Sequence, residues 1–228
     1  MYIPSFNQIY QYQKYNRLDG DIRLYDTPSG KLPSVTTILA MTESEEDKQG
    51  LENWRSFVGA KTADTITTEA ANIGSFMHGN LENRLLGKPD IQGSMPIRVQ
   101  ARKMADVIQY NLWPKISEVQ GMEVALYYPG LYAGTTDLIG IHDGELSILD
   151  YKNSRKPKKR EFILNYFMQG AAYALAHNEL YKTNIKKIVI AVCVRTTPLQ
   201  YQEFIIDEEF NYFCDMWVSR LDQYYKDK

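Results

Sequence analysis

Two aspartates and a lysine in the middle of the chain have the types and the spacing of a metal-binding cluster. Asp143 and Gly144 predict the turn of a β-hairpin, because a type I′ turn requires positive φ at both central residues. With that turn, Asp137 and Asp150 lie opposite each other, with Cβ atoms roughly 5 Å apart. Lys152 comes two residues after Asp150 and therefore faces the same side of the sheet.

A cation is expected between these carboxylates. Like charges on opposed strand positions are destabilising, and two half-buried carboxylates repel unless a proton or a cation lies between them. Mg²⁺ takes oxygen ligands, typically one or two carboxylates with water and substrate phosphate. The same sheet face is apolar near the turn, which makes the cluster continuous with the core. The alternative is an exposed hairpin end with three solvated charges.

Positive charge is concentrated directly after this cluster. The formal net charge of the 228-residue chain is −2, so the overall charge does not indicate a nucleic-acid partner. A basic run beside a metal site nevertheless suits a polyanionic substrate, and the alternative is a solvated loop. The run consists of Lys152, Arg155, Lys156, Lys158, Lys159 and Arg160.

The cysteine content and the lack of targeting signals restrict the class of protein. Cys193 and Cys214 are the only cysteines, which excludes a disulfide framework and a four-cysteine metal site and favours a reducing compartment. The sequence has no secretory signal, no apolar run long enough to cross a membrane, and no internal repeat. We therefore expect a soluble intracellular protein, with one large domain or a domain with an insertion.

The first half of the chain is predicted to be mostly helical after a short hairpin. The hairpin strands are Asp21–Tyr25 and Lys31–Val35, and Ser34 or Thr36 then caps a short helix that runs to Met41. Three helices follow: one led by the acidic residues Glu43–Asp47 and containing Leu51, Trp54, Arg55 and Val58, one over Ala63–Leu86, and an amphipathic one from Ile97 to Leu112 that Pro114 ends.

In the second half the hydrophobic period changes to two, which predicts strands. The expected strands are Glu118–Tyr128, Ala133–His142, Glu145–Lys152, Ile185–Arg195 and Gln200–Ile206, and the expected helices are Arg160–His177 and Glu208–Lys226. The near-continuous apolar run in Ile185–Arg195 is typical of a strand covered on both sides. The order predicts an α+β fold with helices against one sheet. Residues 1–228 form a single domain, with a helical part at 42–114 and a sheet-containing core at 118–228.

Several short motifs follow one another along the chain: Gly74-x-x-x-His78, Glu123 within Met122–Ala125, Gly134–Asp137, Asp150–Lys152 and Gln169-x-x-x-Tyr173, with Pro33–Thr36 and Leu51–Arg55 in support. In this order they resemble the PD-(D/E)XK nuclease superfamily, in particular the RecB-like group of mitochondrial genome maintenance exonucleases and their phage-borne relatives. The resemblance runs from about Lys31 to the C-terminal helix. It implies a restriction-endonuclease-like core of helix, three antiparallel strands, helix and strand, with extra N-terminal helices.

The resemblance implies roles for the clustered residues in phosphodiester hydrolysis. Asp137 and Asp150 would bind Mg²⁺ or Mn²⁺ together with the backbone carbonyl of Tyr151. Lys152 would orient or activate the attacking water and offset charge in the transition state. His78 would reach the metal from its helix, although a lone histidine on a helix is also compatible with a core residue. The resemblance also implies 5′-phosphate products.

Glu123 depends on the length of the preceding hairpin loop. A two-residue loop at Pro129 and Gly130 would pair Glu123 with Thr136 and point it away from the cluster. A three-residue loop would pair it with Asp137, and the resemblance favours this second register because the family has an acid there.

Two further motif residues lie one helical turn apart. Gln169 and Tyr173 could support Lys152 and the substrate backbone, or simply pack within the core. His142 and His177 are expected to have structural roles. The two cysteines cannot hold the four-cysteine iron-sulfur cluster found in some relatives.

The function implied is a metal-dependent exonuclease acting from ends of single-stranded DNA in replication, recombination or repair, in the cytoplasm, or in the host cytoplasm for a phage protein. Residues Thr42–Pro114 would cover the metal site so that a strand end must be threaded, with bases stacked on aromatics; plain core packing is the alternative. A structure-specific endonuclease and a silent DNA-binding subunit are the other functions considered. The expected DNA contacts are Ser34, Thr36, Trp54, Trp113, Arg155, Lys156, Lys158 and Lys159.

Overall fold

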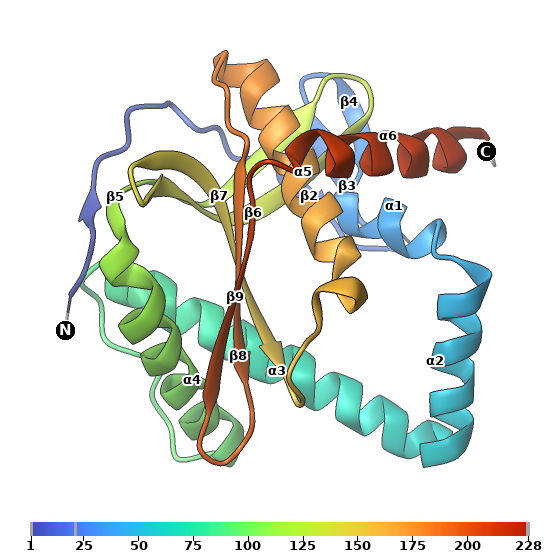
Figure 1. Ribbon diagram of the computed structural model, residues 1–228, viewed down its shortest axis with the longest axis vertical. Helices are drawn as coiled ribbons and strands as arrows, with labels where there is room; N and C mark the ends of the chain where they lie inside the picture. The colour runs from blue at the N-terminus through green and yellow to red at the C-terminus, as the bar shows by residue number, and fades with distance from the viewer. Residues whose placement is uncertain (1, 21, 227–228) are drawn as a thin grey trace.

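A six-stranded sheet forms the centre of the fold. The computed structural model describes residues 2–20 and 22–226, and Figure 1 shows helices on both sides of this sheet. The strands lie in the order β1 (Ser5–Phe6), β5 (Ile116–Tyr128), β6 (Tyr132–His142), β7 (Glu145–Ser154), β8 (Lys187–Val194) and β9 (Gln200–Ile206). Neighbours are antiparallel, except that β1 is parallel to β5 and β7 is parallel to β8. The mixed helix and strand composition agrees with the prediction.

Each face of the sheet has its own hydrophobic core. Because successive residues of a strand point to opposite faces, Ile139 and Ile148 pack toward one core and Leu138 and Leu149 toward the other. The first core is completed by α1 (Val35–Met41), α5 (Leu164–Tyr181) and α6 (Phe210–Lys226), and the second by α3 (Ala60–Leu85) and α4 (Pro96–Leu112). All of β8 is buried, as predicted for a strand covered on both sides.

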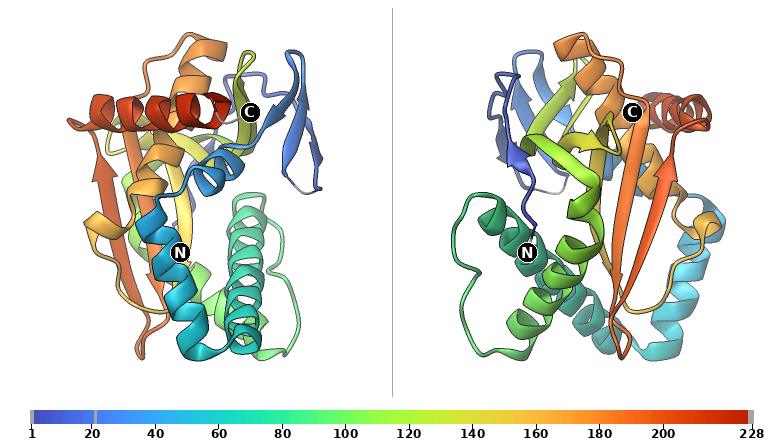
Figure 2. Two further views of the ribbon diagram at one scale, coloured as in Figure 1. Left: turned by 90° about the vertical axis from the view of Figure 1, so that its right-hand side faces the viewer. Right: turned by 60° about the vertical axis from the view of Figure 1, so that its left-hand side comes forward.

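Helix α2 (Glu45–Val58) differs from the other helices because none of its residues is buried. It leads from the end of α1 to the start of α3 and stands apart from the sheet (Figures 1 and 2). The hydroxyl of Ser34 caps α1 by accepting from the N–H of Thr37 at 3.0 Å, and Ser44 caps α2 by accepting from Asp47 at 3.1 Å. Helix α2 is therefore defined at its start by a cap rather than by burial.

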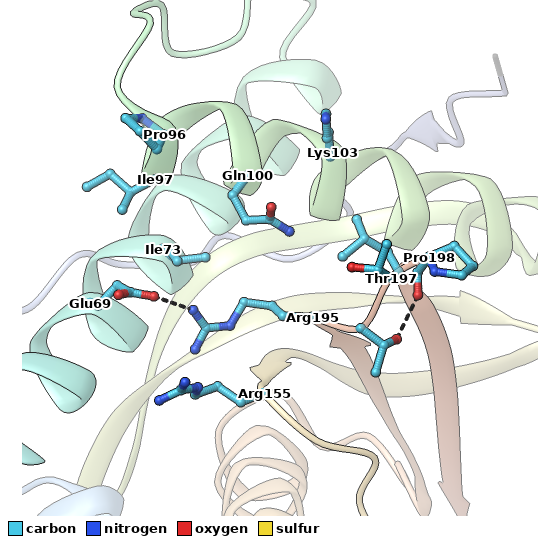
Figure 3. A pocket seen from close by; sticks show the side chains of 12 residues that line it. Glu69, Ile73, Pro96, Ile97, Gln100, Lys103, Arg155, Arg195, Thr197 and Pro198 are labelled. Atoms are coloured by element: carbon cyan, nitrogen blue, oxygen red, sulfur yellow. Dashed lines mark hydrogen bonds and ion pairs between the residues drawn. The ribbon is translucent and has the colours of Figure 1, made fainter.

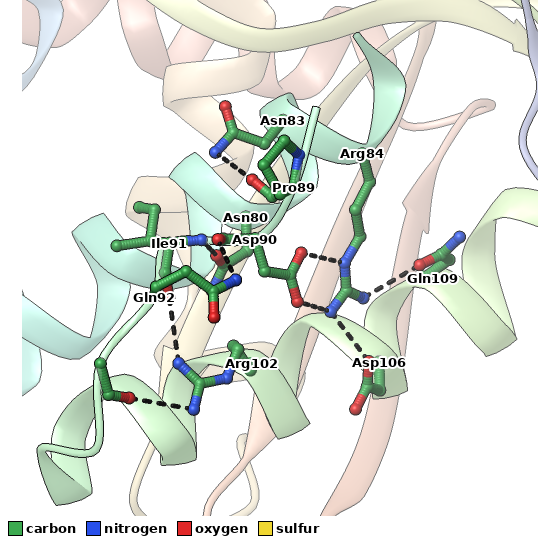
Figure 4. Close-up of polar contacts among 11 residues, drawn as sticks. Asn80, Asn83, Arg84, Pro89, Asp90, Ile91, Gln92, Arg102, Asp106 and Gln109 are labelled. Atoms are coloured by element: carbon green, nitrogen blue, oxygen red, sulfur yellow. Dashed lines mark hydrogen bonds and ion pairs between the residues drawn. The ribbon is translucent and has the colours of Figure 1, made fainter. Parts of the chain in front are cut away.

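Arg84 fixes the connection between α3 and α4 (Figure 4). Its guanidinium donates to both carboxylate oxygens of Asp90, at 2.8 and 2.6 Å, and to the side-chain carbonyl of Gln109 at 2.9 Å. An ion pair with Asp106 at 2.9 Å joins the same group to α4. Bidentate pairs of this kind are geometrically specific, so the network holds α3 at a set position over the sheet.

The element boundaries differ from the sequence predictions in the N-terminal hairpin. The strands are β3 (Leu24–Thr27) and β4 (Gly30–Pro33), and an unpredicted strand β2 (Asn16–Leu18) pairs with β3. Asp21, the predicted start of the first strand, lies outside the described residues.

The predicted start of the helix after the basic loop is also wrong. A 3-10 turn occupies Arg160–Phe162, and α5 begins at Leu164. The side chain of Phe162 is 71% exposed and does not belong to the buried stripe of the helix.

Candidate active site

The site forms where β6 and β7 separate. The predicted turn is present, with positive φ at Asp143 (46°) and Gly144 (84°), and the pairing of His142 with Glu145 confirms the predicted register. The ladder extends to the pair Leu138 and Leu149 and ends there, one position before the two aspartates.

Asp137 occupies the opening between the separated strands. Its Oδ2 accepts a hydrogen bond from the backbone N–H of Tyr151 at 2.7 Å. The carboxylate thus accepts from a backbone N–H of β7 where the two strands are no longer paired. This hydrogen bond holds Asp137 at the edge of the gap.

Three side chains from three elements meet at this gap. His78 of α3, Glu123 of β5 and Asp137 of β6 each contribute a ligand atom, and these atoms all lie within 4.8 Å of one another. His78 Nδ1 is 3.2 Å from Asp137 Oδ1. Two carboxylates and an imidazole form a donor set that a divalent cation can occupy, with the oxygen donors suited to Mg²⁺ or Mn²⁺.

Glu123 reaches the cluster through an unusual backbone conformation. The hairpin pairs Tyr128 with Tyr132, so its loop has three residues, and this is the register that brings Glu123 level with Asp137. Glu123 has a φ of 47°, in the left-handed region that few residues other than glycine adopt. Strain of this kind is concentrated at functional sites.

A second group of charges lies beside the cluster on β7. Lys152 Nζ is 2.5 Å from Asp150 Oδ2, and the side chain of Gln169 contacts both residues, accepting from Lys152 at 3.3 Å and donating to Asp150 Oδ1 at 3.5 Å. Gln169 also donates to the hydroxyl of Tyr173 at 3.2 Å. The ring of Tyr166 lies 5.0 Å from Lys152 Nζ, within cation–π range. The structure therefore brings together Asp150, Lys152, Gln169 and Tyr173, as the motifs suggested.

Burial and mutual repulsion shift the acidic groups of the site. Burial raises the pKa of Asp150 to about 6, with Asp137 adding to the effect and Lys152 opposing it. Partial desolvation by the surrounding chain and the charge of Asp137 raise the pKa of Glu123 to about 7, although the residue is solvent-exposed. Both carboxylates thus retain protons at higher pH than isolated carboxylates in water do, because desolvation and the charge of Asp137 disfavour their ionised forms.

His78 and Asp137 behave as an ion pair. Burial opposes the charged forms of both groups. The attraction between them nevertheless raises the pKa of His78 to about 9 and holds the pKa of Asp137 below its ordinary value. A cation bound by His78 would displace its proton, because metal ligation requires the neutral imidazole.

Two motif glycines lie at close approaches around the site. A Cβ at Gly74 would lie 2.8 Å from the side-chain nitrogen of Asn153, and a Cβ at Gly134 would lie 2.6 Å from the ring of Tyr173. Glycine at position 134 lets the Tyr173 ring of α5 pack directly against β6, whereas the contact at Gly74 involves a side-chain end that could shift.

The cluster opens into a hollow of about 470 Å³ that includes residues the sequence did not single out. Arg17, Arg23 and Tyr25 of the N-terminal sheet line it together with Ser34 and Thr36. Ser34 is buried and Thr36 is exposed. No motif marked the two arginines, because their position depends on how the small sheet packs against β6.

The predicted DNA contact at Trp113 is wrong. Its side chain is fully buried in the core under α3 and α4, where its Nε1 donates to the hydroxyl of Tyr151 at 3.4 Å. Trp54 is half-buried on α2 and stays a candidate. Arg155, Lys156 and Lys159 are exposed in the loop after β7, and Lys158 is half-buried there.

His142 and His177 are fully buried, away from the cluster. The two ring nitrogens of His177 contact the hydroxyls of Tyr12 at 3.0 Å and Thr183 at 2.7 Å. These contacts fit the structural role predicted for His177. Among the described residues, no helix combines the length and hydrophobicity of a membrane span.

The sequence is similar to mitochondrial genome maintenance exonuclease 1 of vertebrates. Identity is 26% over 205 residues with the Mus musculus protein, 27% over 215 residues with that of Xenopus tropicalis and 25% over 207 residues with that of Homo sapiens. These matches cover 85%, 88% and 86% of this chain but 59% of each relative. The chain therefore spans about three fifths of the length of the curated relatives it matches. The resemblance inferred from the motifs is confirmed, and no protein-family model matches the sequence.

Solved structures with a similar arrangement are more distant. A presumed exonuclease of Eubacterium rectale has a TM-score of 0.49 and 12% identity, covering 68% of this chain and 64% of that one. An alkaline exonuclease of Laribacter hongkongensis has a TM-score of 0.31 and 13% identity, covering 68% of this chain and 85% of that one.

Proposed function

We propose that this chain is a metal-dependent exodeoxyribonuclease of the RecB-like PD-(D/E)XK type. The observation that carries the proposal is the convergence of His78, Glu123 and Asp137 within 4.8 Å, beside the ion pair of Asp150 and Lys152. Acids and an imidazole can hold a catalytic metal ion, and a lysine beside them can stabilise charge during phosphodiester hydrolysis. The vertebrate relatives named as exonucleases support the same reaction.

The proposed cation is Mg²⁺ or Mn²⁺, held by His78, Asp137 and Asp150 with the backbone carbonyl of Tyr151. When bound, it would supply Lewis-acid stabilisation and a lowered pKa for the attacking water. Glu123 completes the acidic wall of the site and holds the water on its side of the scissile phosphate. Raised carboxylate pKa values fit this assignment, because a bound divalent cation would favour the charged forms that burial and the neighbouring carboxylates disfavour.

Lys152 is the proposed source of fixed positive charge at the reacting phosphate. Asp150 and Gln169 hold its ammonium in place, and the Tyr166 ring lies beside it. A cation held in this way stabilises charge that develops in the transition state without further reorganisation. Cleavage would leave 5′-phosphate ends, as in the resembling family.

The substrate we propose is single-stranded DNA that enters by an end. Helix α2 leads from α1 to α3 without burying any residue, and it leaves Leu51 and Phe57 exposed, Phe57 by 88%. Apolar and aromatic side chains on such a helix can stack on bases without regard to sequence. In this proposal the strand is threaded past α2 and reaches the cation site end first.

Closed circles test this threading. Linear single strands labelled at one end should be degraded with Mg²⁺, while closed single-stranded circles, and linear strands blocked at both termini by a bulky group, should survive. Lys152→Ala is the control for contaminating nucleases. Rapid cutting of the circles would contradict the exonuclease assignment and favour an endonuclease of the same fold.

The cellular setting is part of the proposal. We place the enzyme in DNA replication, recombination or repair, of a phage type, and in the cytoplasm of the cell or of the host. The two cysteines support a reducing compartment. A silent DNA-binding subunit is disfavoured because Asp137, Asp150 and Lys152 are all present.

A further inference from the structure

A second charged hollow, drawn in Figure 3, shares none of its lining residues with the hollow at the cation site. It has a volume of about 750 Å³ and is bounded by α3, α4 and the connection from β8 to β9. The charged side chains that line it are Lys103, Arg155, Arg195 and Glu69. Three basic groups against one acid give the hollow an excess of positive charge.

Arg195 is the most constrained of these groups. Its side chain is only 10% exposed, and its Nη1 is 2.8 Å from Glu69 Oε1. Its Nε and Nη2 atoms are buried and have no hydrogen-bond partner within residues 2–20 and 22–226. Buried donors without a partner are costly, more so on a charged group. These covered donors would gain a partner if the Arg195 side chain turned toward an anion in the hollow.

The hollow is connected to the catalytic strand. The backbone N–H of Arg195 donates to the carbonyl of Ser154 at 2.8 Å, two residues after Lys152. Asn153 donates to the carbonyl of Ala70 on α3 at 3.2 Å, which fixes the helix that lines both hollows.

Helix α3 supplies residues to both hollows. Glu69 lines the second hollow and His78 lines the first, so they lie ~13 Å apart along the helix. A phosphate in the second hollow would therefore belong to a different nucleotide of a strand from the phosphate at the cation site.

We propose that this hollow binds a backbone phosphate of the DNA strand, a few nucleotides from the cleaved bond. Arg195 offers two adjacent donors in the geometry that suits phosphate oxygens, and Lys103 and Arg155 add charge. Gln100 and Thr196 also line the hollow and supply polar side chains. This inference rests on the proposed function, because it assumes a DNA substrate.

Binding of labelled single-stranded DNA without metal, measured against salt concentration, tests the inference. Arg195→Gln and Lys103→Ala should each weaken binding of a long oligonucleotide, Arg195→Gln by about tenfold. Each should also reduce the slope of log affinity against log salt by ~0.7, the value for one phosphate contact on a single strand. A trinucleotide too short to reach the hollow should bind wild type and variants equally.

Lys186→Ala is the matched control. It removes the same charge from an exposed position at the opposite end of β8 and should leave the slope unchanged. Lys103 is also exposed, so Lys103→Ala keeps the test valid if Arg195→Gln does not fold.

Other outcomes overturn the inference in distinguishable ways. If both variants degrade and bind long DNA as Lys186→Ala does, the second site is absent while the proposed function stands. If inorganic phosphate raises the melting temperature of wild type but not of Arg195→Gln, and the DNA slopes remain equal, the hollow binds a free anion instead of the strand. If wild type neither binds nor degrades DNA, the proposed function fails and this inference with it.

Discussion

His78 and His177 lie in helices on opposite faces of the sheet, and their surroundings have opposite effects. At His78, the charge of Asp137 outweighs burial and raises the pKa to about 9. At His177, burial alone lowers the pKa to about 4, among the rings of Tyr10 and Tyr181. The region around His78 gathers charged groups in ion pairs, whereas the groups that contact His177 are uncharged hydroxyls and aromatic rings. Chemistry is expected in the first region and stability in the second.

Lys152→Ala should have the largest effect of the variants considered, and it changes the charged region around His78. It should lower the rate of DNA cleavage by about a thousandfold, because a fixed charge that acts on the transition state is removed. Binding of metal and DNA should change little, since no ligand is lost. Gel assays with end-labelled DNA, together with equilibrium binding, measure the two effects separately. Lys186→Ala should cut DNA at the wild-type rate, and a Lys152→Ala rate within tenfold of wild type would refute the role.

His177→Gln tests the uncharged region around His177, through the dependence of the unfolding free energy on pH. The folded pKa of about 4 lies below the ordinary value of 6.5, so the unfolded chain binds the proton first as the pH falls. The stability that neutral His177 contributes is complete above pH 6.5 and is lost toward pH 4, a total of about 3 kcal/mol. Denaturant unfolding without metal should show this loss in wild type and a smaller one in His177→Gln.

His78→Gln is the matched substitution in the other region. It should raise the Mg²⁺ concentration needed for cleavage at least about tenfold and keep the His177-dependent loss of stability between pH 6.5 and 4. If His177→Gln instead impaired the Mg²⁺ requirement, the division between the two regions would be wrong.

Local signals in the sequence were sufficient for the turn and register of the β6–β7 hairpin as far as Leu138 and Leu149, but they did not predict that the strands separate at Asp137. Asp143 and Gly144 have one compatible turn, and the period of two then determines which residues share a face. This places Asp150 and Lys152 together without further information. The position of Glu123 could not be derived in this way, because both loop lengths after Tyr128 were compatible with the residues. The positive φ of Glu123 was not predicted either, because no glycine marks this position.

Tertiary packing decided the features that the sequence did not predict. Trp113 follows an amphipathic helix, and a 3-10 turn at Trp113–Lys115 directs it into the core, which no periodicity indicates. Strand β2 has three exposed residues, too few for an alternating pattern to be recognised. Arg195 directly follows the apolar strand β8. The sequence does not predict its contact with Glu69, because Glu69 lies on a helix far away in the chain.

The smallest expected effect concerns the repulsion between Asp137 and Asp150 in the region around His78. Asp150 is 4% exposed, and burial together with Asp137 disfavours its ionised form. Asp150→Asn keeps the shape of the side chain and removes the charge, so it should abolish cleavage yet raise the metal-free unfolding free energy at pH 7 by several tenths of a kcal/mol, as for an opposed like-charge pair. Adding Mg²⁺ should then stabilise wild type more than Asp150→Asn, because only wild type keeps both carboxylates for the cation. Thermal unfolding with and without Mg²⁺ measures both differences. A clear loss of metal-free stability in Asp150→Asn would mean that the ion pair with Lys152 outweighs the repulsion from Asp137, and that this region too is organised for stability.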